Sequence, residues 1–145
     1  MRRHQPHLGL QDQAFARAAL DLVGAKFRLH GRSPETGLDC VGVVVAGLRA
    51  IGRRCELPTG YLLRTGTWPD ADAWAQRHSF LAVGGPARPG DVLLMSPGPG
   101  QLHLAVVSPD PAMIVEAHAL LRKVVLGPAP SPATVLRHWR LIPSL

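Results

Sequence analysis

The chain of 145 residues is 46% hydrophobic and only 5% aromatic, which excludes a disordered protein and predicts one domain, residues 1–145, with a core of Ala, Val and Leu. The formal net charge of +6 at pH 7 favours polyanionic surroundings. The arginines are not interleaved with aromatic residues, so we do not expect a nucleic-acid-binding protein. The longest apolar run, residues 41–48, is far shorter than the roughly 20 residues of a membrane-spanning helix.

The cysteine content argues against disulfides and metal sites. Cys40 and Cys55 are too few for a disulfide framework, and no zinc-type spacing of Cys and His accompanies them. We therefore expect no metal and no organic cofactor. The basic N-terminus is not followed by the apolar segment of a secretory signal, which predicts a protein without a signal peptide.

The first half of the chain is expected to be mainly helical. Apolar residues recur at helical spacing from 15 to 23, which predicts an amphipathic helix ending near Gly24. A polar, turn-rich stretch at 30–36 follows. The β-branched run within 41–51 is typical of a buried strand and equally of a buried helix, so the residues alone leave this element open.

The second half of the chain has a different sequence pattern, which is typical of strands. Residues 58–72 look irregular, and Pro69-Asp70 is expected to open a short helix around Trp74. From Pro89 onward, short apolar runs alternate with Pro/Gly turns. These predicted strands are Val92–Met95, 102–107, Met113–His118, 123–126 and 135–142. Helices followed by strands predict an α+β fold in which N-terminal helices pack on an antiparallel sheet.

Cys40 is the candidate nucleophile. It lies in Gly37-Leu38-Asp39-Cys40-Val41-Gly42, directly before the apolar segment. If that segment is a helix, its N-terminus favours a thiolate by about 0.3–1 kcal/mol, so an imidazole must supply most of the activation. Asp39 is better suited to capping the helix than to catalysis. The alternative for Cys40 is a small buried hydrophobe, a common role for a lone cysteine.

His103 is the candidate base. It alternates with apolar residues in 102–107 and should project from one face of a strand, where an ordinary core or surface histidine is the alternative. Glu116 and His118 share one face of the next predicted strand. Either could accept the far N–H of His103 and set its tautomer. The residues alone do not decide between them.

Five motifs, in this order, make the chain resemble the NlpC/P60 family of papain-like cysteine peptidases, which cleave stem peptides of bacterial peptidoglycan. They are Gly24-Ala25-Lys26-Phe27-Arg28, Gly31-Arg32-Ser33-Pro34, Asp39-Cys40-Val41-Gly42, Arg88-Pro89-Gly90-Asp91 and His103-Leu104-Ala105-Val106. The resemblance spans about residues 14–126. It implies a papain-like NlpC/P60 fold in which 41–51 is a helix.

The resemblance also implies a mechanism. Cys40 would attack an amide of the stem peptide, in the γ-D-glutamyl-diamino acid linkage, and form an acyl-enzyme, with His103 shuttling the proton and the Cys40 amide stabilising the oxyanion. The third catalytic residue is His118 in one alignment and Glu116 in another, and we favour His118. The expected partner is peptidoglycan or its muropeptides.

The chain departs from the family pattern at two positions, and the first departure favours an alternative function, whereas the second should affect the start and packing of the helix more than the chemistry. Phe27 stands where the family usually has Tyr, and Val41 stands where it has Ser. The alternative is a catalytically idle structural or wall-binding domain of a phage tail or tail-like particle. Short family members without a signal resemble phage-tail peptidases. This resemblance implies tail proteins as further partners, and a protein that is cytoplasmic before assembly and later acts on the wall from the particle.

Overall fold

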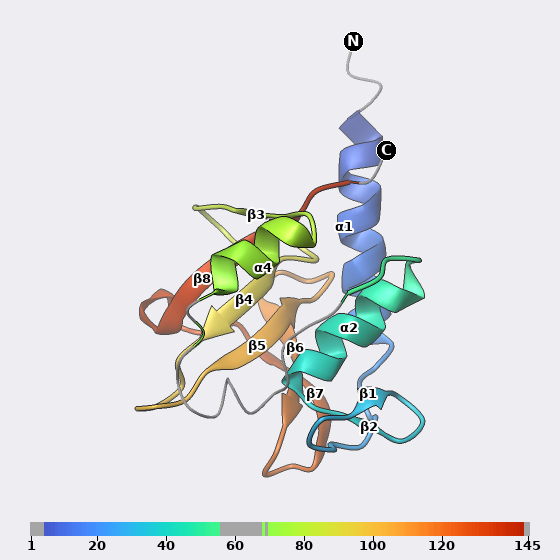
Figure 1. Cartoon of the computed structure of the whole chain (residues 1–145), viewed down its shortest axis with the longest axis vertical. Helices are drawn as coiled ribbons and strands as arrows, with labels where there is room; N and C mark the ends of the chain where they lie inside the picture. Colours follow the sequence, from blue (N-terminus) through green and yellow to red (C-terminus); the bar gives the residue numbers. More distant parts are fainter. Residues whose placement is uncertain (1–4, 56–67, 69, 144–145) are drawn as a thin grey trace.

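The computed structural model describes residues 5–55, 68 and 70–143, and it has helices packed against a six-stranded antiparallel sheet (Figure 1). The helices are α1 (Gln5–Leu20), α2 (Cys40–Ala50), α4 (Ala71–Arg77) and the 3-10 turn η1 (Pro132–Thr134). The sheet contains β3 (Phe80–Ala82), β4 (Val92–Met95), β5 (His103–Val107), β6 (Met113–His118), β7 (Lys123–Pro128) and β8 (Val135–Leu141). The expected α+β architecture is confirmed.

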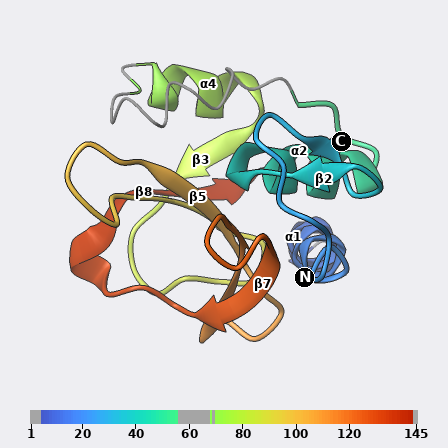
Figure 2. The same ribbon diagram turned by 90° about the horizontal axis from the view of Figure 1, so that it is seen from below.

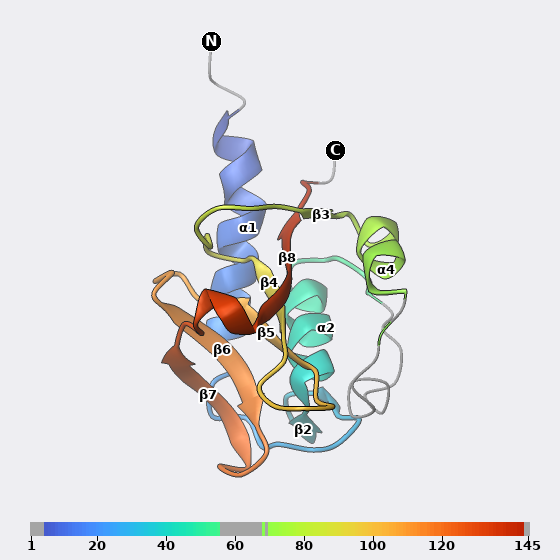
Figure 3. The ribbon, with the colours of Figure 1, turned by 90° about the vertical axis from the view of Figure 1, so that its left-hand side faces the viewer.

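The strand order in the sheet is β3-β8-β4-β5-β6-β7, and all neighbouring strands are antiparallel. A separate two-stranded ribbon joins β1 (Arg32–Ser33) to β2 (Gly37–Leu38). Viewed from below, α1 is seen end-on beside α2, and both helices lie on the same side of the sheet (Figure 2). The β6–β7 hairpin extends past the N-terminal end of α2 and lies close to β2 (Figure 3). None of the described helices is long and apolar enough to cross a membrane.

Helix α2 forms in spite of its β-branched residues because its start is capped and its residues 41–48 are buried on every side. The side chain of Asp39 accepts a hydrogen bond from the Gly42 N–H at 2.8 Å, which satisfies a donor that the helix leaves free. Every residue from 41 to 48 is buried between α1 and the sheet. A helix buried on all sides has no amphipathic period, which explains why the sequence pattern alone could not identify it.

Gly42 lets the first turn of α2 approach the preceding loop. A Cβ atom at position 42 would collide with the carbonyl oxygen of Gly31 and crowd a methyl group of Leu38. The glycine therefore holds the start of the helix, and Cys40 with it, against the β1–β2 ribbon.

Both faces of the sheet are packed. Leu104 and Val106 of β5 join the main core beneath α2, whereas Ala105 and Val107 join a second cluster on the opposite face. Successive side chains of a strand point to opposite faces of the sheet, which places these two pairs of residues in different clusters. The first residue of the strand, His103, is only partly buried and lies at the edge of this packing.

Asp91 ties the sheet together at the start of β4. It is fully buried, lies 2.6 Å from Nε2 of His138, and accepts two bonds of 2.9 Å from the guanidinium of Arg140 on β8. The backbone N–H of Arg88 donates to the same carboxylate at 2.9 Å. The motif Arg88-Pro89-Gly90-Asp91 thus acts structurally, by closing a turn and joining two strands.

Several predicted boundaries differ from the structure. Helix α1 ends at Leu20 and is followed by turns up to Gly24, because the chain there bonds to Val124 of the sheet. Strand β3 was not predicted, since its three residues pair only with the distant β8. The short helix around Trp74 is confirmed. The expected irregular stretch 58–72 lies largely outside the described residues, and the single domain 1–145 stays a prediction.

Replacing Gly42 by alanine should lower the free energy of unfolding by about 1–3 kcal/mol, because the new methyl group has no space beside the Gly31 carbonyl. The matched control is Gly84→Ala, since a Cβ at position 84 meets nothing within 4 Å and the residue lacks a positive φ. Urea unfolding of both variants tests the prediction. Equal stability of the two would show that the loop yields freely at this contact.

Candidate active site

Cys40, the first residue of α2, lies in a cleft of about 770 Å³ between the start of the helix and the sheet. The cleft is formed by the N-terminus of α2, the start of β5, the end of β6 and the loops beside them. Its lining residues are Phe27, Leu29, Asp39, Cys40, Pro97, Gln101, Leu102, His103, Glu116, Ala117, His118, Ala119 and Leu120. All candidate catalytic residues from the sequence are therefore in one cavity, and Cys55 is not among its lining residues.

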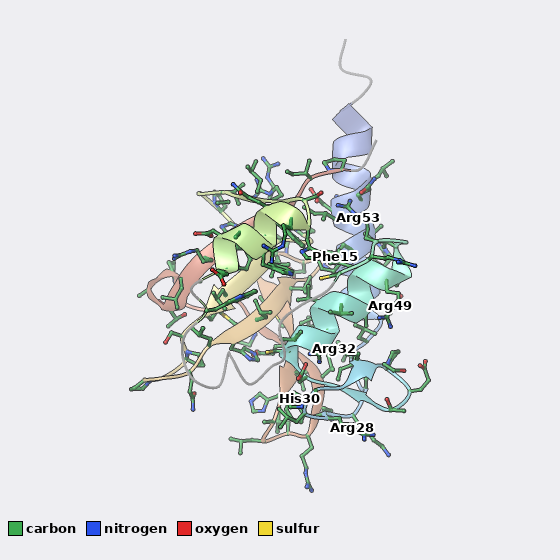
Figure 4. All side chains as sticks on the ribbon, viewed as in Figure 1. Phe15, Arg28, His30, Arg32, Arg49 and Arg53 are labelled. Carbon is green, nitrogen blue, oxygen red and sulfur yellow. The ribbon has the colours of Figure 1, made fainter. Side chains whose placement is uncertain are left out.

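Asp39 fixes the position of the neighbouring cysteine. Its side chain is nearly buried, with 4% of the residue exposed, and accepts three hydrogen bonds. The donors are the N–H of Gly42 at 2.8 Å, the N–H of His30 at 2.8 Å and the guanidinium of Arg32 at 2.9 Å. Figure 4 shows His30 and Arg32 beside the N-terminal end of α2. The carboxylate is fully engaged in this structural role, as the sequence suggested for a cap.

His103 joins Cys40 to a carboxylate. Its Nε2 lies 2.8 Å from Oε1 of Glu116, and its ring also forms a hydrogen bond with the Cys40 side chain. Because Nε2 is used by Glu116, Nδ1 is the nitrogen that faces the sulfur. Thiol, imidazole and carboxylate thus follow one another across the cleft, which is the arrangement that nucleophilic catalysis by cysteine requires.

The electrostatics favour a charged imidazolium. Burial lowers the pKa of His103, but its hydrogen bonds and charge interactions with Cys40 and Glu116 outweigh this effect and raise the pKa from 6.5 to about 9. The hydrogen bond from His103 is also the largest cause that lowers the pKa of Glu116 from its ordinary value.

The residue bonded to His103 is Glu116, the alternative, rather than His118, which we favoured from the sequence. The Nδ1 atom of His118 instead accepts the backbone N–H of Leu121 at 3.2 Å. His118 lines the same cleft, but among the described residues the side-chain partner of His103 on β6 is Glu116 and not His118. The geometry supports Glu116 as the residue that orients the base.

Some residues of the site were not predicted. Arg32 holds Asp39, and Leu29, Leu102 and Leu120 give the cleft apolar walls. The only sequence signal for Arg32 was its position as a cation shortly before a capping aspartate. Nothing in the sequence pattern indicated that the three leucines line the cleft. Within the described parts of the chain, no three His, Cys, Asp or Glu side chains are grouped as metal ligands.

No protein-family model and no curated protein matches the sequence. Solved structures do match. The P60 domain of an antigen from M. avium subspecies paratuberculosis is 19% identical, with a TM-score of 0.60 over 94% of this chain and 98% of that one. The NlpC/p60 domain of the peptidoglycan hydrolase SagA is 20% identical, with a TM-score of 0.61 over 90% of this chain and 98% of that one.

An NlpC/P60 family protein from Bacillus cereus is 19% identical, with a TM-score of 0.64, but the match covers 91% of this chain and only 40% of that one. The chain thus corresponds to nearly all of two isolated domains and to less than half of a larger protein. These similarities show that the chain has the NlpC/P60 fold, as the sequence motifs predicted.

Replacing Glu116 by glutamine should lower the pKa of His103 from about 9 towards 6.5, because the carboxylate that stabilises the imidazolium is lost. NMR titration of the His103 ring measures this directly. His118→Ala is the matched control from the same strand, and it should leave the titration near 9. A shift of similar size in the control would contradict the assignment of Glu116 as the partner.

The raised pKa of His103 also predicts a pH dependence of stability. Because the folded value of about 9 lies above the unfolded value near 6.5, the stabilisation is fully present below pH 6.5 and is lost as the pH rises through about 9. The difference in unfolding free energy between wild type and Glu116→Gln should therefore be larger at pH 6 than at pH 10. Urea unfolding at the two pH values tests this, and a constant difference would argue against it.

Proposed function

We propose that the protein is a cysteine peptidase that hydrolyses amide bonds in peptidoglycan stem peptides. The observation that carries the proposal is the sequence of contacts from Cys40 through His103 to Glu116 within one open cleft. The structural neighbours add support, because SagA and RipB from Mycobacterium tuberculosis are both described as peptidoglycan hydrolases.

The reaction proceeds in two stages. The Cys40 thiolate attacks the carbonyl carbon of the amide, and His103 then gives its proton to the departing amine, which leaves a thioester. A water molecule next loses a proton to His103 and attacks the thioester carbon, which releases the carboxylic acid and restores the thiolate. Glu116 holds the Nε2 side of the ring, so that Nδ1 stays directed at the sulfur in both stages.

The start of α2 supplies the groups that stabilise the oxyanion. Within the described part of the chain, the N–H groups of Gly42 and Val43 are used by Asp39. Among the described residues, the N–H groups of Cys40 and Val41 donate to no other backbone group. They are therefore available for the negative oxygen that forms next to the sulfur.

The bond that we propose is cleaved is the γ-D-glutamyl-diamino acid linkage, as the family resemblance implies.

A catalytically idle wall-binding or structural domain is the second candidate function, and Phe27 favours it. Phe27 lines the cleft where the family usually carries a tyrosine, so this position provides no phenolic hydroxyl. Delivery to the wall in a phage tail or tail-like particle stays a prediction from the sequence.

Incubation with diaminopimelate-type muropeptides should release new fragments with the wild-type protein, and Cys40→Ala should reduce their rate of formation by on the order of 10⁴-fold or more, because the nucleophile is removed. Mass spectrometry of the products measures the rate and identifies the bond. Cys55→Ala is the matched control, since Cys55 is outside the cleft, and it should retain activity.

Thiol alkylation separates the peptidase from the idle domain. In the peptidase, Cys40 should react with iodoacetamide faster than Cys55 below pH 7, because the imidazole of His103 forms a hydrogen bond with the Cys40 side chain. Two slow thiols, together with no fragments from the wild type, would reject the peptidase in favour of the second candidate.

A further inference from the structure

Two lysines face each other beside the cleft. Lys26 and Lys123 are partners in an antiparallel bridge between the segment after α1 and the start of β7. The bonds on either side run from the Phe27 N–H to the Arg122 carbonyl at 3.0 Å and from the Val124 N–H to the Ala25 carbonyl at 2.8 Å. The lysines thus form a non-hydrogen-bonded pair, in which opposed Cα atoms are only about 4.5 Å apart.

This pairing is unfavourable in the isolated protein. Both lysines are exposed, and like charges directly opposite each other in a sheet are destabilising. Among the described residues, none of the ion pairs includes either lysine or the exposed arginines Arg28 and Arg122 beside them. A bound anion would remove the repulsion.

His118 connects the lysine pair to the cleft. It is the register partner of Lys123 in the β6–β7 hairpin, and register partners project to the same side of a sheet. Because its Nδ1 accepts the Leu121 N–H, the proton of the neutral ring is on Nε2, which can act as a donor. His118, Lys123 and Lys26 therefore form a row of donors across three adjacent chain segments, starting from a wall of the cleft.

Acidic residues near the row are few, and the nearest, Glu116, is bonded to His103 at 2.8 Å. Residues 117–127 contain no Asp or Glu. The segment 24–38 contains only Glu35, which accepts a hydrogen bond from Ser33 at 2.6 Å. Figure 4 shows Arg28 at this end of the molecule and Arg49 near the far end of α2. Cations are thus concentrated around the β6–β7 turn, whose residues Ala119 and Leu120 line the cleft.

We propose that the row of His118, Lys123 and Lys26 binds a free carboxylate of the peptidoglycan stem peptide. The inference rests on the proposed function and extends it to substrate selection. A glutamyl residue linked through its γ-carboxyl keeps its α-carboxylate, which carries a full negative charge at neutral pH. The row therefore gives the protein a preference for stem peptides with a free α-carboxylate over stem peptides in which this carboxyl is amidated.

The test compares two soluble muropeptides that differ only in whether the glutamyl α-carboxyl is free or amidated. Wild type should cleave the acid form with a kcat/KM about three- to tenfold higher, as expected for a few exposed charge contacts. Lys26→Glu/Lys123→Glu should remove this preference through a higher KM for the acid form. Added salt should weaken the preference in wild type, because exposed charges are screened.

The matched control is Arg49→Glu/Arg54→Glu, which makes the same change in net charge at exposed arginines away from the row. It should keep the wild-type preference. Equal cleavage of the two substrates by wild type, or an unchanged preference in the lysine variant, would overturn the proposal.

A binding measurement separates failure of this proposal from failure of the proposed function. The Cys40→Ala variant is titrated with each muropeptide, and the NMR signals of Lys26, His118 and Lys123 are followed. Tighter binding of the acid form, with shifts at these residues, supports the row even when wild type cleaves neither substrate. Identical binding of the two forms overturns it.

Discussion

The carboxylate of Asp39 is the constraint on which the site depends. It is almost buried, and it receives three hydrogen bonds from the helix start, from the loop before it and from Arg32. Loss of this carboxylate would leave buried donors without a partner, which typically costs about 1–3 kcal/mol for each. The interaction fixes the direction of α2 and leaves its first two N–H groups free beside the sulfur.

The candidate catalytic groups come from three elements, and the docking of those elements sets their geometry. Cys40 belongs to the helix, whereas His103 and Glu116 belong to two adjacent strands. The strands are held together farther along, where Val106 and Val107 pair with β6, and α2 packs across both strands. The well-packed core thus holds the base and its partner at one fixed distance from the nucleophile.

Much of this arrangement could be predicted from the sequence. Alternating apolar runs identified five of the six strands, and the order of the motifs indicated the fold. The choice between Glu116 and His118 could not be made, because a period of two places both on one face. The structure favours Glu116 because its carboxylate lies 2.8 Å from Nε2 of His103, and such a contact leaves no trace in residue spacing. The helical state of α2 likewise depends on burial by distant segments.

The bond that orients His118 comes from main chain, and this has an evolutionary consequence. Any residue except proline at position 121 supplies the same N–H, so the ring can keep its orientation while the turn around it changes. Leu120 and Leu121 are 89% and 56% exposed, so substitutions there disturb little of the interior. Under the proposed function, relatives of this chain can therefore diverge in the substrates they accept by altering this turn, without any compensating change at Cys40, His103 or Glu116.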